Sequence, residues 1–346
     1  MVPMSLRILA PPTSDTSEAP SLVLQCDARK YMFNVGEGTT RVSAQHRASN
    51  MRVDHIFLTR VASETMGGIP GLLMTLADGG RESIDIHAPP NLLYALAATR
   101  LYARRDTMAL NAHEIEVREP HVCYQDEYVQ IHSVPLVPAQ HRSLYTDIAE
   151  KGPALDVKAQ LSSPKALRGS QAKAWYECIL RDAWTNSERT SPGPARSAHL
   201  LPPPPVPYAP DGPEPGRQAA VLAYICAGHI QRGKFDAEQA MALGVPPGKS
   251  FARLARGETI TVSRPVAWEQ MDQDARQAWL RAQQRRDPGP APMPVEDVQV
   301  ASQEVVGASR AGPVFFYLHV PTPAHVEALV QSDAFAPYTH LSLIHI

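Results

Sequence analysis

Runs of proline interrupt this chain and set the main limit on how it can fold. The sequence holds 33 prolines among 346 residues, with dense runs at 201–207 and 210–216 and a further cluster at 287–294. Proline fixes φ and lacks a backbone N–H, so it interrupts helices and removes donors from central strands. Consecutive prolines favour extended polyproline geometry instead. The chain therefore cannot be one compact fold from end to end, and residues 139–216 are predicted to be a Pro-rich, largely disordered insertion.

Strands and helices alternate on both sides of this insertion, which indicates an α/β fold. Ile69, Leu72, Leu73 and Leu76 recur at helical spacing, and Gly79-Gly80 follows as a stop. Short apolar or β-branched runs predict buried strands. The expected strands are a hairpin at 21–25 and 30–35, then 55–59, 84–87, 129–134, 221–226 and 313–319, with further helices at 90–105, 172–184 and 324–331.

Composition excludes several classes of protein. With 33 basic and 35 acidic residues, the formal charge of −2 excludes a globally basic nucleic-acid coat, so any contact with RNA is local. No apolar run approaches the roughly 18 residues of a membrane span. Four cysteines lie far apart without a C-x-x-C pair, which favours reduced, mostly buried thiols in an intracellular protein. The N-terminus does not have the pattern of a signal peptide.

The segment from Phe57 to Leu73, FLTRVASETMGGIPGLL, is the most informative in the chain. Its Thr59 and its Gly68-Ile-Pro-Gly71 resemble the metal loop of the metallo-β-lactamase fold in the tRNase Z branch. In that family a strand ends in Thr-His-x-His-x-Asp-His-x-x-Gly-Leu-Pro-Gly. These side chains hold two zinc ions, which generate a hydroxide nucleophile and polarise a phosphodiester.

The ligand positions of that loop do not match the family. Arg60 and Ala62 stand where two histidines belong, Glu64 stands in the Asp position, and Thr65 replaces the last histidine. Arginine stays protonated and alanine has no donor atom. The sequence therefore predicts no metal site and no catalytic residue in this chain. A lone carboxylate such as Glu64 is expected to be a solvated or capping residue.

Two further segments resemble the same family. Residues 33–41, FNVGEGTTR, are similar to its Gly-Glu-Gly-Thr-Gln-Arg turn, and 233–254 are similar to its tRNA-binding arm, Leu-Gly-Val-Pro-x-Gly-Pro, with Lys249 in place of the last proline. In the N-terminal half of long-form eukaryotic tRNase Z, the metal-ligand motif of this loop is lost while the rest of the loop is kept. The chain resembles that half over roughly residues 5–138 and 217–340. Gly36-Glu37-Gly38 is either an ordinary turn or a brace for a neighbouring domain.

The resemblance implies a metallo-β-lactamase-like αββα sandwich with a protruding arm and a long Pro-rich insertion. The predicted parts are a first half of the domain at 1–138, the insertion at 139–216, and a second half at 217–346. The last part is expected to include a basic arm at 231–262 and a flexible Pro-rich break at 287–294.

Residues 232–256 carry five basic and two acidic side chains, a local excess of three positive charges, with Phe235 and Phe251 between them. In most proteins such a run is a solvated helix face. Together with the resemblance it predicts an arm that grips RNA phosphates without reading bases. The predicted tRNA-binding residues are Arg232, Lys234, Lys249, Phe251, Arg253 and Arg256. None of the 13 histidines forms a ligand pair, so His55, His87 and His319 are expected at core or edge positions.

The function implied by the resemblance is that of the N-terminal, non-catalytic half of an endonuclease that removes the 3′ trailer from precursor tRNA. The expected partners are precursor tRNA and the catalytic half, which would carry the zinc, and no membrane. This chain alone is predicted to be inactive. The family continues beyond Ser342 into the catalytic half, and both a truncated sequence and a natural short product stay open. Nucleus, mitochondrion and cytoplasm are the expected locations. The alternative is a non-catalytic scaffold subunit of an RNA-processing complex.

Overall fold

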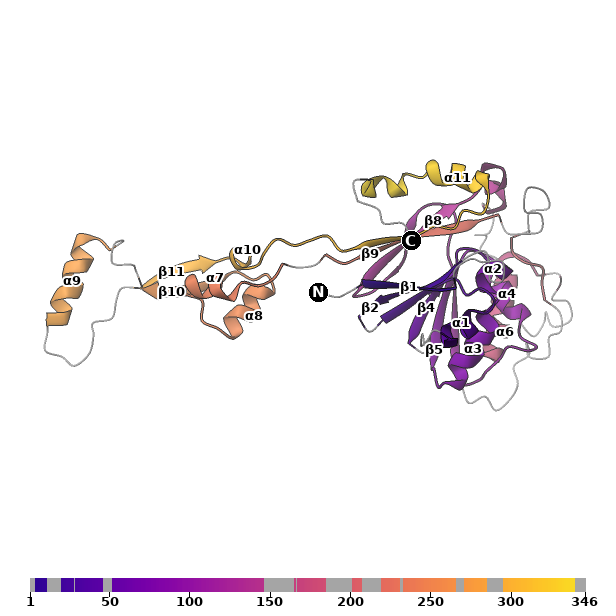
Figure 1. The fold of residues 1–346 in the computed structure, drawn as a ribbon, viewed down its shortest axis with the longest axis horizontal. Coiled ribbons are helices and arrows are strands. Elements are labelled where there is room, and N and C mark those ends of the chain that lie inside the picture. Colours follow the sequence, from indigo (N-terminus) through magenta and orange to yellow (C-terminus); the bar gives the residue numbers. More distant parts are fainter. Residues whose placement is uncertain are drawn as a thin grey trace. The chain divides into compact units, whose positions relative to one another are not determined.

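The computed structural model describes residues 4–10, 20–27, 29–45, 52–145, 165, 167–184, 201–206, 219–230, 233–265, 271–284 and 295–339. The chain divides into two compact units (Figure 1). The larger unit comprises residues 1–229 and 313–346, and the smaller one comprises residues 230–312. Each unit has a hydrophobic core of its own.

The larger unit contains a six-stranded sheet in the order β1-β2-β3-β4-β5-β6. The first three strands pair antiparallel, whereas β3 to β6 run parallel. This arrangement confirms the predicted N-terminal hairpin. The strands are β1 (Met4–Ala10), β2 (Ser21–Cys26), β3 (Arg29–Phe33), β4 (Val53–Phe57), β5 (Ser83–Ala88) and β6 (Ala109–Glu114).

A second, antiparallel sheet has the order β12-β9-β8-β7. Its strands are β7 (His121–Gln125), β8 (Val129–Leu136), β9 (Val221–Gly228) and β12 (Val314–Tyr317). Helix α11 (Pro323–Val330) and the 3₁₀ turn η5 (Asp333–Tyr338) pack on the outer face of this sheet. Buried His325 holds α11 in place, because its Nε2 lies 2.9 Å from the carbonyl oxygen of Ala219, just before β9.

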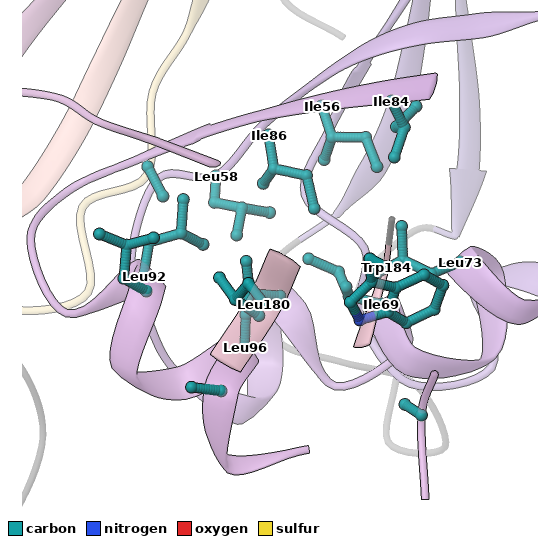
Figure 2. Close-up of a cluster of buried hydrophobic side chains, with 14 of the residues drawn as sticks. Ile56, Leu58, Ile69, Leu73, Ile84, Ile86, Leu92, Leu96, Leu180 and Trp184 are labelled. Carbon is teal, nitrogen blue, oxygen red and sulfur yellow. The ribbon is translucent and has the colours of Figure 1, made fainter. Parts of the chain in front are cut away.

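Apolar side chains from both sheets form the layer between them, including Phe33, Phe57 and Tyr224. Another core lies on the opposite face of the first sheet, where the strands contact the helices (Figure 2). The helices of this part of the chain are α1 (Thr39–Gln45), α2 (Ser63–Met66), α3 (Ile69–Asp78), α4 (Leu92–Ala98) and α6 (Gly169–Ala183). The layers therefore follow the order helix, sheet, sheet, helix.

Helix α4 ends at Ala98, well before the predicted end at Arg105. The side chains that follow the helix explain the early stop. The Thr99 hydroxyl donates to the carbonyl oxygen of Leu96 at 2.7 Å, and the Arg100 guanidinium donates to that of Ala97 at 3.1 Å. Side-chain donors thus satisfy carbonyls that a continuing helix would have used.

Part of the predicted insertion belongs to the core. Helix α6 buries Trp175 and Tyr176 completely against α4 and the first sheet. A short 3₁₀ turn, η1 (Ala139–Tyr145), precedes it. Most other residues of 139–216 lie outside the described part of the chain, as does the predicted break at 287–294, so disorder there stays a prediction.

The smaller unit is built on a two-stranded ribbon with short helices beside it. It has a core that includes Ala240, Leu254 and Val300, all fully buried. The unit extends to residue 312, whereas the sequence placed the arm at 231–262. Its elements are α7 (Ala237–Ala242), α8 (Lys249–Ala255), β10 (Ile260–Pro265), α9 (Gln273–Gln284), β11 (Val295–Val300) and α10 (Ser302–Val305).

Histidines on three adjacent strands, His55, His87 and His113, lie side by side in the larger unit. The ring of His87 lies 4.6 Å from that of Phe57 and 4.7 Å from that of His113, measured between centroids. Burial, together with the charges of His113 and His55, lowers the pKa of His87 to about 3. His87 is therefore neutral in the folded protein. The predicted core or edge placement of His55 and His87 is confirmed.

We expect acid to destabilise the larger unit through His87. Its pKa falls from 6.5 to about 3 on folding, so the unfolded state binds more protons between these values. The free energy of unfolding should therefore decrease as pH falls through that window, by about 2 kcal/mol at pH 5 from this group. Urea titrations at pH 7 and pH 5 would measure the loss, and His87→Phe should reduce it. The exposed control His229→Asn should retain the full loss, and an equal loss in His87→Phe would contradict the assignment.

Candidate functional site

The loop that resembles a metal loop begins where the two sheets are joined. Its first residues follow β4, and both are bonded to β9 of the other sheet. The hydroxyl of Tyr224 donates to the carbonyl oxygen of Leu58 at 2.7 Å, and the backbone N–H of Leu222 donates to that of Thr59, also at 2.7 Å. The start of the loop is therefore fixed by main-chain acceptors and does not depend on the loop's own side chains.

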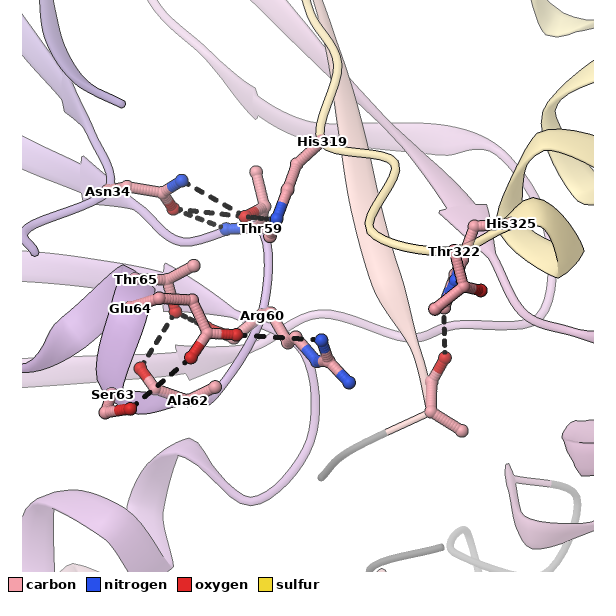
Figure 3. Close-up of polar contacts among 11 residues, drawn as sticks. Asn34, Thr59, Arg60, Ala62, Ser63, Glu64, Thr65, His319, Thr322 and His325 are labelled. Carbon is pink, nitrogen blue, oxygen red and sulfur yellow. Dashed lines mark hydrogen bonds and ion pairs between the residues drawn. The ribbon is translucent and has the colours of Figure 1, made fainter. Parts of the chain in front are cut away.

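A polar node around Asn34 and Thr59 completes this junction (Figure 3). Asn34 follows β3 in a left-handed conformation, with φ of 53°, and its Oδ1 accepts from the backbone N–H of Thr59 at 2.9 Å. Its Nδ2 donates to the hydroxyl of Tyr317 at 2.8 Å. His319 Nδ1 lies 2.9 Å from the Thr59 hydroxyl oxygen. Residues at the ends of β3, β4 and β12 thus meet at one point.

The turn at Gly36 braces the far end of the same loop. The backbone N–H of Gly68 donates to the carbonyl oxygen of Val35 at 2.9 Å, and that of Val35 donates to the carbonyl oxygen of Thr65 at 2.7 Å. A Cβ atom on Gly68 would lie 2.3 Å from the carbonyl oxygen of Gly36, closer than any side chain permits. Gly38 has φ of 77°, as a glycine turn requires. The turn therefore supports the loop of its own unit.

Arg60 and Glu64 form a buried ion pair inside the loop. Arg60 Nη1 lies 3.6 Å from Glu64 Oε1, and the side chains are only 1% and 8% exposed. The Thr65 hydroxyl donates to the carbonyl oxygens of Arg60 at 2.5 Å and Ala62 at 3.1 Å. The expectation that Glu64 is solvated is therefore wrong. A buried carboxylate needs a nearby cation, and Arg60, four residues earlier, supplies it.

The residues of this loop do not fit a metal ion. Arg60 brings a fixed positive charge into the space, Ala62 offers no donor atom, and the Thr65 hydroxyl is engaged with backbone carbonyls. Within the described ranges, no group of three or more His, Cys, Asp or Glu is placed to bind a metal. No catalytic step through a metal follows for this chain.

The basic residues predicted to bind RNA gather on α8 of the smaller unit. Lys249, Arg253 and Arg256 are spaced so that they share one side of the helix, and all three are exposed. Arg253 Nε also donates to Glu258 Oε2 at 2.7 Å. Lys234 is exposed before α7, and Arg232 lies outside the described residues.

Phe251 faces the core of the arm. Its ring lies 5.0 Å from that of Phe235, and both pack against the buried core that includes Leu254. Phe251 therefore supports the helix that carries the basic residues. Its predicted contact with tRNA stays a prediction.

The residues that hold the loop were not identified from the sequence. Asn34, Tyr317 and His319 come together only because β3 and β12, nearly three hundred positions apart, belong to sheets that meet there. A single sequence carries no signal for such a pairing. Asn34 alone stood within a motif, the turn after the first hairpin.

Two stacked sheets between helical layers, with the Phe57–Leu73 loop at the end of β4, have the arrangement of the metallo-β-lactamase fold. A family profile described as tRNase Z endonuclease matches residues 7–68, which include the first part of this loop, as far as Gly68. The predicted fold and the predicted resemblance are both confirmed. The chain is therefore related to the tRNase Z endonucleases.

The chain is similar to several individual proteins over different lengths. The chain is 28% identical to a mitochondrial tRNase Z of Arabidopsis thaliana, over 94% of this chain and 26% of that protein. It is 26% identical to the human zinc phosphodiesterase ELAC protein 2, over 74% of this chain and 27% of that protein. A solved long form RNase Z from yeast is 20% identical, with a TM-score of 0.49, over 67% of this chain and 28% of that one.

The chain spans about a quarter of the length of these curated relatives. In the part of the chain that the structure describes, no helix is both long enough and apolar enough to cross a membrane.

Breaking the ion pair from one side should unfold the loop. Arg60→Met would leave the Glu64 carboxylate buried without its partner, and we expect a loss of about 3–5 kcal/mol in the free energy of unfolding. The double variant Arg60→Met/Glu64→Met removes both charges and should return to within about 2 kcal/mol of the unchanged chain. Urea denaturation of the single and double variants measures the coupling.

The control for this prediction is Arg105→Met, which breaks the exposed pair with Asp78. An exposed pair of this kind contributes little to stability, because water screens the charges. If Arg60→Met were no more destabilising than Arg105→Met, the loop would not depend on its ion pair.

Proposed function

We propose that this chain is the N-terminal, non-catalytic half of a long-form tRNase Z, whose whole enzyme removes the 3′ trailer from precursor tRNA. The observation that carries the proposal is the buried Arg60–Glu64 ion pair, which occupies positions that the resemblance assigns to metal ligands. In this proposal the chain supports an activity located in another part of the protein. The short coverage of its relatives supports the same view, since the chain corresponds to only about a quarter of each.

The role proposed for this half is to hold tRNA with the arm. Lys249, Arg253 and Arg256 present exposed positive charge on one side of α8, and the arm's own core keeps that helix in place. Contacts from such side chains to phosphates position an RNA without reading its sequence. This suits a substrate class whose members share a shape and differ in sequence. Lys234, Phe251 and Arg232 belong to the same proposed surface.

The catalytic half is the proposed partner and the expected carrier of zinc. There the zinc would supply the hydroxide that attacks the phosphodiester. In this chain the same loop contributes only structure. Relatives that match over 94% of the chain carry mitochondrial in their names, and we propose the mitochondrion as its location, with the nucleus as a second site.

The purified chain should bind no stoichiometric zinc and should not cleave precursor tRNA, because the loop holds no set of metal ligands. A chelator should leave its melting temperature unchanged. Elemental analysis, a melting curve with and without EDTA, and a cleavage assay on precursor tRNA would check these points. Two tightly held zinc ions per chain, or cleavage of the trailer by the chain alone, would contradict the proposal.

Removing the positive charges of α8 should weaken tRNA binding. For the triple variant Lys249→Ala/Arg253→Ala/Arg256→Ala we expect a lower affinity and a shallower dependence of log K on log salt. The slope should decrease by about 0.7–0.9 for each phosphate that the arm no longer neutralises. Filter binding over a salt series would measure both.

The matched control is Arg104→Ala/Arg118→Ala/Lys165→Ala, three exposed basic residues of the larger unit with the same change in charge. It should bind tRNA more tightly than the α8 variant does. Equal decreases in affinity for the two variants would show that total charge matters and that the arm does not.

A scaffold subunit of an RNA-processing complex is the alternative function. It would share the ion pair in the loop but would not need a basic helix on the arm. The two proposals differ in the binding experiment, because a scaffold would bind tRNA no better with α8 intact than with the triple variant.

A further inference from the structure

A short proline segment, Leu201-Pro-Pro-Pro-Pro-Val206, lies on the larger unit without forming a helix or strand. Pro202 and Val206 are buried, whereas the prolines between them are partly or fully exposed. Leu201 packs against the helical core, and Val206 belongs to the core between the sheets. The segment is thus anchored at both ends and open in the middle.

Asn91 recognises the main chain of this segment at one end. Its Nδ2 donates to the carbonyl oxygen of Val206 at 2.8 Å, and its Oδ1 accepts from the backbone N–H of Val206 at 2.9 Å. Asn91 is fully buried and adopts a left-handed conformation, with φ of 77°. The paired amide bonds imitate the pairing of two strands, and they depend on backbone rather than on a particular side chain.

Tyr176 recognises the other end. Its hydroxyl donates to the carbonyl oxygens of Pro202 at 3.1 Å and Pro203 at 2.7 Å, although the side chain is fully buried in α6. The ring of Tyr94, from α4, lies 5.8 Å from that of Tyr176 in an edge-on arrangement. A tyrosine pair with a hydroxyl directed at proline carbonyls is the chemistry by which proteins bind Pro-rich chains.

We propose that Asn91 and Tyr176, with Tyr94 packed against Tyr176, form a binding site for proline-rich extended segments, which the chain's own residues 201–206 occupy. The hydrogen bonds from Asn91 and Tyr176 go to the main chain of the segment, so they require an extended backbone, which proline favours. Such a chain is already close to its bound conformation and loses little entropy on binding. The covalent connection keeps the occupant at high effective concentration, which excludes a competing segment until the occupant is displaced.

The test uses the full chain and a labelled peptide with the sequence of residues 199–208, HLLPPPPVPY. In a vacated variant, residues 201–206 are replaced by alternating Gly and Ser. Fluorescence polarisation should show that the vacated chain binds the peptide and that the unchanged chain binds it at least about tenfold more weakly. A peptide with alanine at all four positions 202–205 keeps these backbone groups but is less extended when free, so it should bind the vacated chain more weakly.

Tyr176→Phe in the vacated background checks the assigned contact. Loss of the hydroxyl removes a hydrogen bond worth about 1 kcal/mol, so the affinity for the peptide should decrease about fivefold. Equal affinity of the vacated and unchanged chains, or no binding by a vacated chain that melts cooperatively, would overturn the proposal. If the vacated chain does not fold, the variant Val206→Asp serves instead, because a charge at this buried anchor should release the segment. The peptide affinity of this variant is then compared with that of the unchanged chain, and equal affinities would overturn the proposal.

Discussion

The Arg60–Glu64 ion pair lies in the loop through which the two sheets are joined, and the larger unit depends on that loop keeping its shape. Backbone acceptors at Leu58 and Thr59 tie the loop to β9, and Asn34 ties it to β3 and β12. The ion pair fills the interior of the loop with two opposite charges. Because a buried charge is costly without its partner, neither residue is free to change alone.

The exposed basic residues of α8 belong to the smaller unit, which has a hydrophobic core of its own. Its core lies between the ribbon and its short helices, and the aromatic pair of Phe235 and Phe251 belongs to that core. The basic residues of α8 remain exposed. For the proposed binding of RNA, such support beneath an exposed charged face would limit the ordering that phosphate contacts require. Aromatic residues interleaved with basic ones thus have a structural use that is independent of RNA.

Local patterns in the sequence predicted local structure well. Helix α3 begins at Ile69 and ends at Asp78, as its apolar spacing and the following glycines indicate. The central strands were found because strands buried on both faces form continuous apolar runs. Strands β6 and β7, half-exposed and without such a pattern, were not found. Burial of Glu64 could not be predicted either, because it depends on the loop's tertiary position. The prediction that this loop binds no metal rests on residue type alone, because arginine and alanine offer no atom that can bind a cation.

The point where the chain enters and leaves the smaller unit has a consequence for how such an arm is gained or lost in evolution. In the larger unit the backbone N–H of Gly228 donates to the carbonyl oxygen of Pro313 at 2.8 Å, so the two ends are adjacent. In the smaller unit a Cβ on Gly233 would come within 1.9 Å of the Gly307 carbonyl oxygen. In each unit, the two segments that lead to the other unit therefore lie side by side. A module bounded in this way can be inserted, exchanged or removed in one genetic event while each core keeps its own packing.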